Sequence, residues 1–312
     1  MPRPCLIAID IDGTLLNSEG HVSRRNRAAL HAAYEADIEI VIATGRRHAY
    51  AMRVIRDLNL CEANALISSN GTVVRTVGAG LVHRTHLSPE TARWLCRHAG
   101  SFRDTLVFTF DNVGPDGEEK AGALVCEASH SLHDAIGGWM LANQRSIRHV
   151  GRLEDALTSA DIGAGPDRNP GPIQAMLSGT VHQMAEAEAL LTQHPRIAAV
   201  GAPESFGCDI VLHRTAYPDR DLAILDILPA GCSKASALAH LAQLRGCTLA
   251  EVLAIGDNWN DLSMLQAAGR AILMGNAPAE LQQLAREHKW HIGPTNDQDG
   301  VAEAIEAVLS ST

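Results

Sequence analysis

The sequence has few aromatic residues and no long apolar run, and both shortages limit what the protein can be. Aromatic residues make up 4% of the 312 residues, which leaves few rings for stacking a flat cofactor. Because no stretch is apolar for long enough to span a bilayer, we expect no membrane segment. The first apolar stretch, Leu6 to Ile9, is too short for a secretion signal and runs directly into acidic residues. We therefore expect a cytoplasmic protein.

Cysteine is present, but without the spacing of a metal or redox motif. No two of the seven cysteines form a CxxC pair. They are Cys5, Cys61, Cys96, Cys126, Cys208, Cys232 and Cys247. An odd number without a secretion signal predicts free thiols in a reducing compartment. The 15 histidines are scattered and show no metal-ligand spacing either.

The sequence also has fewer basic than acidic residues. The formal net charge is −10, with 26 Lys and Arg against 36 Asp and Glu. An acidic surface repels phosphate backbones, so broad nucleic-acid binding is not expected. With 46% hydrophobic residues the chain can bury a large core, and its length predicts two domains or one domain with a large insertion. The oligomeric state cannot be read from the sequence.

Apolar runs alternate with helical patterns at both ends of the chain. Short apolar runs at 6–9, 38–43 and 65–67 are separated by helical patterns, and the alternation returns from 233 to 309. Runs of this kind are typical of strands buried on both faces. The pattern predicts an α/β fold with a doubly wound parallel sheet.

The middle of the chain differs from the two ends. Strand-like patterns at 104–110, 121–127, 173–177, 209–212 and 222–228 surround one helical pattern at 180–193. We interpret this part as an inserted α+β domain. The expected division is a catalytic core formed by residues 1–85 and 229–312, and an inserted domain formed by residues 86–228.

The strongest chemical signal follows the first predicted strand, where the sequence reads Asp10-Ile11-Asp12-Gly13-Thr14-Leu15. Ligands of open α/β sheets bind beyond the carboxyl ends of the strands. Two acids one residue apart at that edge therefore point to a site, and Gly13 permits a tight turn. A solvated acidic turn is the alternative, since Asp and Gly favour turns.

Three further segments fit a phosphate site, although each is weak alone. The second strand ends at Thr44-Gly45-Arg46, which offers a hydroxyl and backbone N–H groups, and the third leads into Ser69-Asn70-Gly71. Lys234 begins the helix that returns to the core. Surface arginines and a solvated helix lysine are the alternatives.

A second acidic pair follows a strand near the C-terminus, in Gly256-Asp257-Asn258-Trp259-Asn260-Asp261. Four acids at one sheet edge repel each other unless a cation is present. Mg²⁺ prefers oxygen ligands and keeps several waters, so the two acidic pairs predict a magnesium site.

Taken in this order, the five motifs resemble the haloacid dehalogenase (HAD) superfamily of phosphatases, and among them the Cof-type hydrolases of subfamily IIB with a C2-type cap. The closing segment Asn296-Asp297-Gln298-Asp299-Gly300 and the phrase from His83 to Glu90 are also similar. The resemblance covers the core, about half of the chain. It implies a Rossmann-like core, with the inserted domain as a cap that selects the substrate.

The resemblance also implies a role for each motif residue. Asp10 is expected to be the nucleophile that forms an aspartyl-phosphate, and Asp12 the acid and base. The expected Mg²⁺ ligands are the Asp10 side chain, the Asp12 backbone carbonyl and Asp257, with Asp261 in support. The expected phosphate-binding residues are Thr44, Gly45, Lys234 and Asn260, the last of which would orient Lys234 or the phosphate.

The implied reaction is hydrolysis of a small phosphorylated metabolite. A phosphomutase of the phosphomannomutase type is the nearest alternative and needs phosphate-binding arginines in the cap. Those in the middle segment are dispersed: Arg93, Arg97, Arg103, Arg145, Arg148, Arg152 and Arg168. A non-catalytic phosphometabolite sensor is the other alternative, but it does not explain the intact set of acids, Thr44 and Lys234. The low aromatic content favours a sugar or polyol phosphate over a flat cofactor.

Overall fold

The computed structural model describes residues 3–114, 116–128, 136–157, 171–198 and 207–310. The chain forms two compact units. Unit 1 consists of Met1–His83 and Ser233–Thr312, and unit 2 of Arg84–Cys232. The sequence placed the second unit at 86–228. Unit 2 extends further because β12 (Leu222–Pro229) runs to Pro229 and the Ala230 N–H then donates to the Asp209 carbonyl.

Unit 1 is built on an eight-stranded sheet with the order β15-β14-β13-β1-β2-β3-β4-β5. Its strands are β1 (Leu6–Ile9), β2 (Glu39–Ala43), β3 (Ala65–Ser68), β4 (Val73–Thr76), β5 (Leu81–Arg84), β13 (Val252–Gly256), β14 (Arg270–Leu273) and β15 (His291–Ile292). The central strand β1 pairs in parallel with β2 and β13. The doubly wound parallel sheet is thus confirmed, except that β4 pairs antiparallel with β3.

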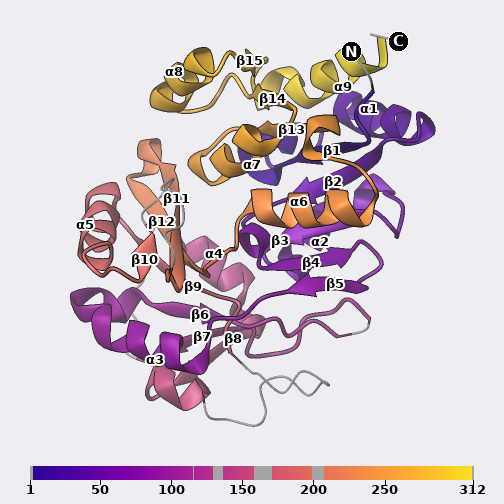
Figure 1. Cartoon of the computed structure of the whole chain (residues 1–312). Helices are drawn as coiled ribbons and strands as arrows, with labels where there is room; N and C mark the ends of the chain where they lie inside the picture. The colour runs from indigo at the N-terminus through magenta and orange to yellow at the C-terminus, as the bar shows by residue number, and fades with distance from the viewer. Residues whose placement is uncertain (1–2, 115, 129–135, 158–170, 199–206, 311–312) are drawn as a thin grey trace. The chain divides into compact units, whose positions relative to one another are not determined.

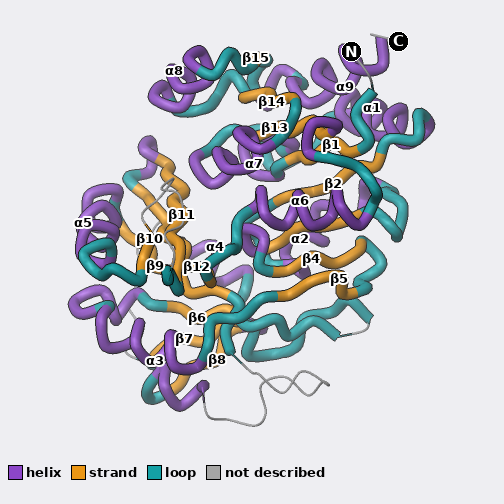
Figure 2. Tube along the Cα trace, viewed as in Figure 1, coloured by secondary structure: helices purple, strands orange, loops and turns teal. Residues whose placement is uncertain are grey.

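Helices cover both faces of this sheet (Figures 1 and 2). They are α1 (Arg24–Glu35), α2 (His48–Ile55), α6 (Lys234–Leu244), α7 (Leu262–Ala267), α8 (Ala279–Glu287) and α9 (Gly300–Ser310). Side chains along β1 alternate between the two faces of the sheet. Ile7 and Ile9 pack on one face with α1, α2 and α9. Leu6 and Ala8 pack on the other face with α6, α7 and α8. Burial on both faces explains why β1 is a continuous apolar run.

Unit 2 contains a seven-stranded sheet with the order β10-β11-β12-β9-β6-β7-β8. Besides β12, its strands are β6 (Val107–Thr109), β7 (Leu124–Glu127), β8 (Ile147–Val150), β9 (Gln174–Gly179), β10 (Ile197–Ala198) and β11 (Ile210–Tyr217). Most neighbouring pairs are antiparallel. The predicted strand at 209–212 is longer, because β11 pairs with β12 along its full length from Ile210 to Tyr217.

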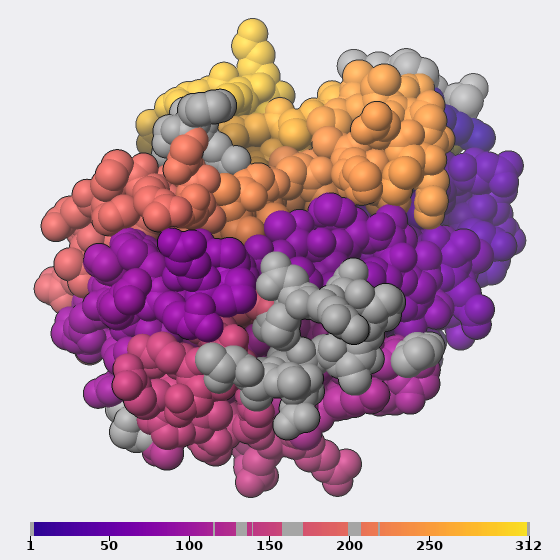
Figure 3. Space-filling view, turned by 60° about the horizontal axis from the view of Figure 1, so that its bottom comes forward, coloured from indigo at the N-terminus to yellow at the C-terminus, as the bar shows by residue number. Residues whose placement is uncertain are grey.

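Helices α3 (Pro89–His98), α4 (Gly137–Ala142) and α5 (Val181–Leu191) also belong to unit 2. The sequence predicted α5 but not α3, although Ser88 caps α3 and Pro89 stands at its first position. Buried residues of α3 and α5 pack in one cluster with one face of the sheet. The ring centroids of Trp94 in α3 and of His194, which follows α5, lie 4.6 Å apart. Figure 3 shows the surface of the α3 segment next to that of the α5 segment.

One arginine of unit 2 is committed to a salt-bridge network. Arg103 binds Glu127 through Nη2 at 2.5 Å and Glu154 through Nη2 at 2.6 Å. The hydrogen bonds from Arg103 lower the pKa of Glu154 to about 2. Arg103 is therefore a structural residue of unit 2, whereas Arg168, another of the dispersed arginines, lies outside the described residues.

No helix within the described ranges has both the length and the apolar character that crossing a bilayer requires.

Candidate active site

The first acidic motif forms a tight turn directly after β1. The Asp10 N–H donates to the Ile255 carbonyl of β13, and residues Ile11–Leu15 then form a turn in which Asp12 and Gly13 have non-helical φ and ψ. Gly13 has a φ of +78°. A Cβ at this position would lie 2.3 Å from Asp257 Oδ2, so the turn tolerates only glycine. The close approach joins the first acidic motif to the second.

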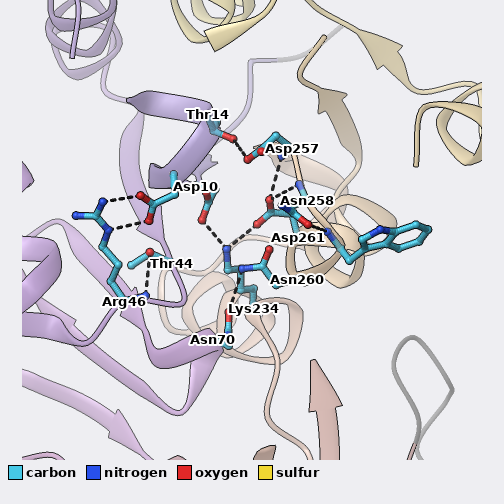
Figure 4. A network of polar contacts seen from close by, with 12 residues as sticks. Asp10, Thr14, Thr44, Arg46, Asn70, Lys234, Asp257, Asn258, Asn260 and Asp261 are labelled. Atoms are coloured by element: carbon cyan, nitrogen blue, oxygen red, sulfur yellow. Dashed lines mark hydrogen bonds and ion pairs between the residues drawn. The ribbon is translucent and has the colours of Figure 1, made fainter. Parts of the chain in front are cut away.

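The second acidic motif follows β13, the parallel neighbour of β1. Asp261 Oδ2 accepts hydrogen bonds from the backbone N–H groups of Asp257 (3.0 Å) and Asn258 (3.1 Å). Thr14 Oγ1 donates to Asp257 Oδ1 at 2.8 Å. Because β1 and β13 are adjacent, their carboxyl ends bring the two motifs together at one sheet edge, as Figure 4 shows.

Lys234 lies between the acids. Its Nζ donates to Asp10 Oδ1 and to Asp261 Oδ1, both at 2.6 Å, and its side chain is fully buried. The residue begins α6, whose N-cap Ser233 forms a capping box with Ser236. A Cβ on Gly71 would lie 2.1 Å from the Ser233 carbonyl, so Gly71 lets this helix start approach the loop after β3.

Burial and mutual repulsion dominate the electrostatics of this cluster. Burial and the charge of Asp261 raise the pKa of Asp10 to about 7, although Lys234 opposes the rise. Burial and the same neighbour raise the pKa of Asp257 well above its ordinary value. Burial alone would lower the pKa of Lys234, but Asp10 and Asp261 outweigh it and raise that pKa. One lysine does not balance three buried carboxylates.

The cluster suits a hard divalent cation. Asp10, Asp257 and Asp261 each offer a carboxylate oxygen, and these atoms lie within 4.8 Å of one another. An all-oxygen set with unbalanced negative charge is what Mg²⁺ accepts. Thr14 and Lys234 bind one oxygen each of Asp257 and Asp10, and the second oxygen of each carboxylate can serve as a ligand. The residues present therefore fit a magnesium ion.

The carboxylate of Asp12 points away from this cluster and is held by Arg46. Arg46 Nε donates to Asp12 Oδ2 at 2.7 Å and Arg46 Nη2 to Asp12 Oδ1 at 2.5 Å. The Asp12 side chain is 41% exposed, and the guanidinium of Arg46 also lies 4.8 Å from the ring centre of Tyr50. Two acids one residue apart therefore lie in different environments, one buried with Lys234 and one half-exposed with Arg46.

Thr44 and Gly45, two of the expected phosphate-binding residues, lie in the loop after β2, which contacts the loop after β3. Thr44 Oγ1 accepts from the Arg46 N–H at 3.1 Å, and the Thr44 carbonyl accepts from the Asn70 N–H. A Cβ on Gly45 would lie 3.1 Å from Asn70 Oδ1, so the two loops are in close contact. Asn260 Nδ2 donates to the same Asn70 oxygen at 3.3 Å. Asn70 thus connects this loop pair to the second acidic motif.

Three residues of the site did not stand out in the sequence. Thr14 and Arg46 belong to the predicted motifs, but their bonds to Asp257 and Asp12 depend on partners from other segments. Asn276 Nδ2 donates to the Gly13 carbonyl at 2.8 Å, and Asn276 Oδ1 accepts from the Asn296 N–H. A signal for Asn276 was its place in a loop just after β14, at the carboxyl edge of the sheet.

Comparisons with known proteins show the family and the fold. A family model described as haloacid dehalogenase-like hydrolase matches residues 7–114 and 212–305. The chain is 29% identical over 315 residues to the 5-amino-6-(5-phospho-D-ribitylamino)uracil phosphatase YwtE of Bacillus subtilis (strain 168). The alignment covers 97% of this chain and 98% of the relative.

Solved structures are similar over almost the whole chain. A haloacid dehalogenase-like hydrolase from Bacteroides thetaiotaomicron is 28% identical with a TM-score of 0.70, covering 98% of this chain and all of its own. The HAD subclass IIB sugar phosphatase BT4131 is 20% identical with a TM-score of 0.68, covering 97% of this chain and 98% of its own. At 20% identity, the similarity to BT4131 shows a shared fold and nothing about activity.

Proposed function

Since this chain belongs to the haloacid dehalogenase-like hydrolases and is a phosphatase of the Cof type, we propose that it is a Mg²⁺-dependent hydrolase of a sugar or polyol phosphate. The observation that carries the proposal is the buried cluster of Asp10, Asp257 and Asp261 around Lys234. In this proposal, the cluster contains the nucleophile, the ligands for a cation and a buried positive charge, all at one edge of the sheet. The substrate is a small phosphorylated metabolite.

We assign the nucleophile to Asp10. An Asp10 oxygen attacks phosphorus, the bond from phosphorus to the substrate oxygen breaks, and an aspartyl-phosphate forms. Lys234, which lies 2.6 Å from Asp10, would stabilise the charge of the transferring group. When bound by Asp10, the Asp12 carbonyl, Asp257 and Asp261, Mg²⁺ would supply further charge neutralisation. Thr44, the Gly45 N–H and Asn260 would position the phosphoryl oxygens.

Asp12 is assigned the proton transfers. Protonated Asp12 gives its proton to the departing substrate oxygen, and the resulting carboxylate then takes a proton from the water that attacks the aspartyl-phosphate. Phosphate leaves and Asp10 is restored. The half-exposed side chain of Asp12 supports this role, since solvent exchange can reset its proton. The two hydrogen bonds from Arg46 would orient the carboxylate form of Asp12 that takes the proton from water, and at least one of them would open when Asp12 carries the proton.

The substrate class rests on two observations. The name of the YwtE relative describes a phosphorylated ribityl chain attached to an aminouracil ring, so the phosphate of that compound is carried by a polyol chain. The low aromatic content of this chain gives little support for stacking a flat cofactor. Because unit 1 supplies every residue proposed here for catalysis and phosphate binding, we assign selection among substrates to unit 2. The cytoplasmic location, expected from the lack of a secretion signal and from the odd number of cysteines, stays a prediction.

Phosphate release from a panel of phosphorylated metabolites, measured with Mg²⁺ and with EDTA, tests the proposal. We expect Mg²⁺-dependent release from a few sugar or polyol phosphates, including phosphorylated ribityl compounds. The Asp10→Asn variant should fold and release nothing. Equal turnover with Mg²⁺ and with EDTA would refute the proposed metal site. Activity in the Asp10→Asn variant would refute the assignment of Asp10 as the nucleophile. Release restricted to flat aromatic phosphates would refute the substrate class, and isomerised sugar phosphate without release would show a mutase.

A further inference from the structure

Two cysteines of unit 1 that are far apart in the sequence lie side by side at its surface. Cys5 precedes β1, and Cys247 follows α6. Both thiols are free and only partly buried, and both pack against the same apolar cluster as α6 and β13. The Cys247 side chain is within hydrogen-bond contact of the Cys5 thiol. The two sulfur atoms are thus already neighbours in the folded chain.

The backbone around both cysteines is well anchored. The Cys5 N–H donates to the Glu251 carbonyl at 2.9 Å, and the Cys5 thiol donates to the same carbonyl at 3.4 Å. The Cys5 carbonyl accepts from the Glu39 N–H. The Cys247 N–H donates to the Ala242 carbonyl at 3.0 Å, which closes the end of α6.

A salt bridge further ties the two segments together. Arg245, two residues before Cys247, binds the Glu39 carboxylate through Nε at 2.7 Å and Nη2 at 3.1 Å. Glu39 is the residue whose N–H bonds to the Cys5 carbonyl. The segments that carry the two neighbouring thiols are therefore anchored by hydrogen bonds on both sides, so a disulfide between Cys5 and Cys247 would join fixed main chain.

We propose that Cys5 and Cys247 form a reversible disulfide when the protein meets a small-molecule disulfide such as oxidised glutathione. The Cys247 thiolate attacks one sulfur of oxidised glutathione, which breaks its S–S bond and releases one glutathione. The Cys5 sulfur then attacks the Cys247 sulfur and releases the second. The two protein thiols lose two electrons and two protons, and the oxidant leaves as two glutathione molecules.

The order of the two steps follows from the surroundings of Cys5. Burial and the nearby Cys247 raise the pKa of Cys5 to about 12, so Cys5 is almost entirely protonated at neutral pH. The first attack therefore falls to Cys247, and Cys5 acts as the resolving thiol. The cross-link joins the start of β1 to the turn after α6, the ends opposite Asp10 and Lys234. It closes a very long loop and should stabilise unit 1 without disturbing turnover.

Peptide mapping by mass spectrometry tests the inference on the full chain. The reduced protein is incubated with oxidised glutathione at mildly alkaline pH, free thiols are alkylated, and the protein is digested without reductant. We expect a peptide pair joined through Cys5 and Cys247 that separates on reduction. Cys5→Ser should stop at a lasting glutathione adduct on Cys247. Cys61→Ser is the matched control, because Cys61 is equally half-buried and belongs to unit 1, and it should behave like the unaltered protein.

A thermal melt gives a second readout. Oxidation should raise the unfolding midpoint of the unaltered protein and of Cys61→Ser by several degrees, but not that of Cys5→Ser. The inference is overturned if both thiols of the unaltered protein are still alkylated after incubation, or if the adduct on Cys247 persists without a cross-link. Since mapping of the unaltered protein alone decides this, a variant that fails to fold does not weaken the test. The result is independent of the proposed phosphatase substrate.

Discussion

The guanidinium of Arg46 makes two hydrogen bonds to the carboxylate of Asp12, at 2.7 Å and 2.5 Å. The pair joins the loop after β2 to the turn after β1, and it holds Asp12 apart from the buried Asp10. Arg46 also lies over the ring of Tyr50, which limits its own movement. The side chain proposed to move protons is therefore held in one orientation by a second side chain.

Replacement of Arg46 by Ala should lower kcat by about 10- to 100-fold, because the Asp12 carboxylate loses both bonds that orient it. We expect a smaller change in KM. Steady-state kinetics on the substrate found in the panel measures both constants. Arg53 faces the same Tyr50 ring at 5.0 Å, and Arg53→Ala is the matched control. Equal losses in the two variants would contradict a special role for Arg46.

Gly13→Ala should reduce turnover by at least about 100-fold, since the added Cβ would collide with the Asp257 carboxylate and the φ of +78° disfavours a side chain. Gly20→Ala is a close control. Gly20 has a φ of +79°, but nothing lies within 4 Å of its Cβ position. The control therefore carries the backbone strain without the collision. If both variants lose activity equally, strain and not the contact with Asp257 is the cause.

Lys234→Met should destabilise the protein by about 3 to 5 kcal/mol, because Asp10 and Asp261 would remain buried without their partner. The free energy of unfolding from urea titration measures the loss. Lys120→Met removes the same charge from an exposed position of unit 2 and should change stability little. Similar values for the two variants would show that the buried ion pairs contribute nothing to the stability of unit 1.

The stability of unit 2 should depend on pH through Glu154. Its pKa falls from 4.5 to about 2 in the folded protein, mainly because Arg103 donates hydrogen bonds to it. A lowered folded-state pKa means stability that is present above pH 4.5 and is lost as the pH falls toward 2. Glu154→Gln should therefore flatten the slope of unfolding free energy against pH in this window by up to about 1.4 kcal/mol per pH unit.

A second ion pair serves as the control for this prediction. Glu306 also accepts two hydrogen bonds from one arginine, Arg25, but both side chains are about half exposed. Solvent screens such a pair, so Glu306→Gln should leave the slope nearly unchanged. An unaltered slope in Glu154→Gln would show that Arg103 does not bind Glu154 more strongly in the folded chain than in the unfolded one.

Local patterns alone were enough to predict the central strands of unit 1, but not β4, β5 and β15 of the same sheet. Strands buried on both faces are continuous apolar runs, so β1, β2, β3 and β13 were recognised close to their observed bounds. The HAD resemblance and the α/β fold are confirmed. The half-covered strands of unit 2 have weaker patterns, which is why β8 and β10 were not predicted.

The sequence by itself determined which acids, which lysine and which glycine turn the protein has, and that the acids follow strands. Only the tertiary structure decided which of these groups meet. The pairings Arg46–Asp12, Lys234–Asp10 and Cys5–Cys247 depend on strand order and on the direction in which each helix returns. Sequence periodicity reports on neighbours within one element, whereas the parallel pairing of β1 with β13 brings together segments that are hundreds of residues apart in the sequence.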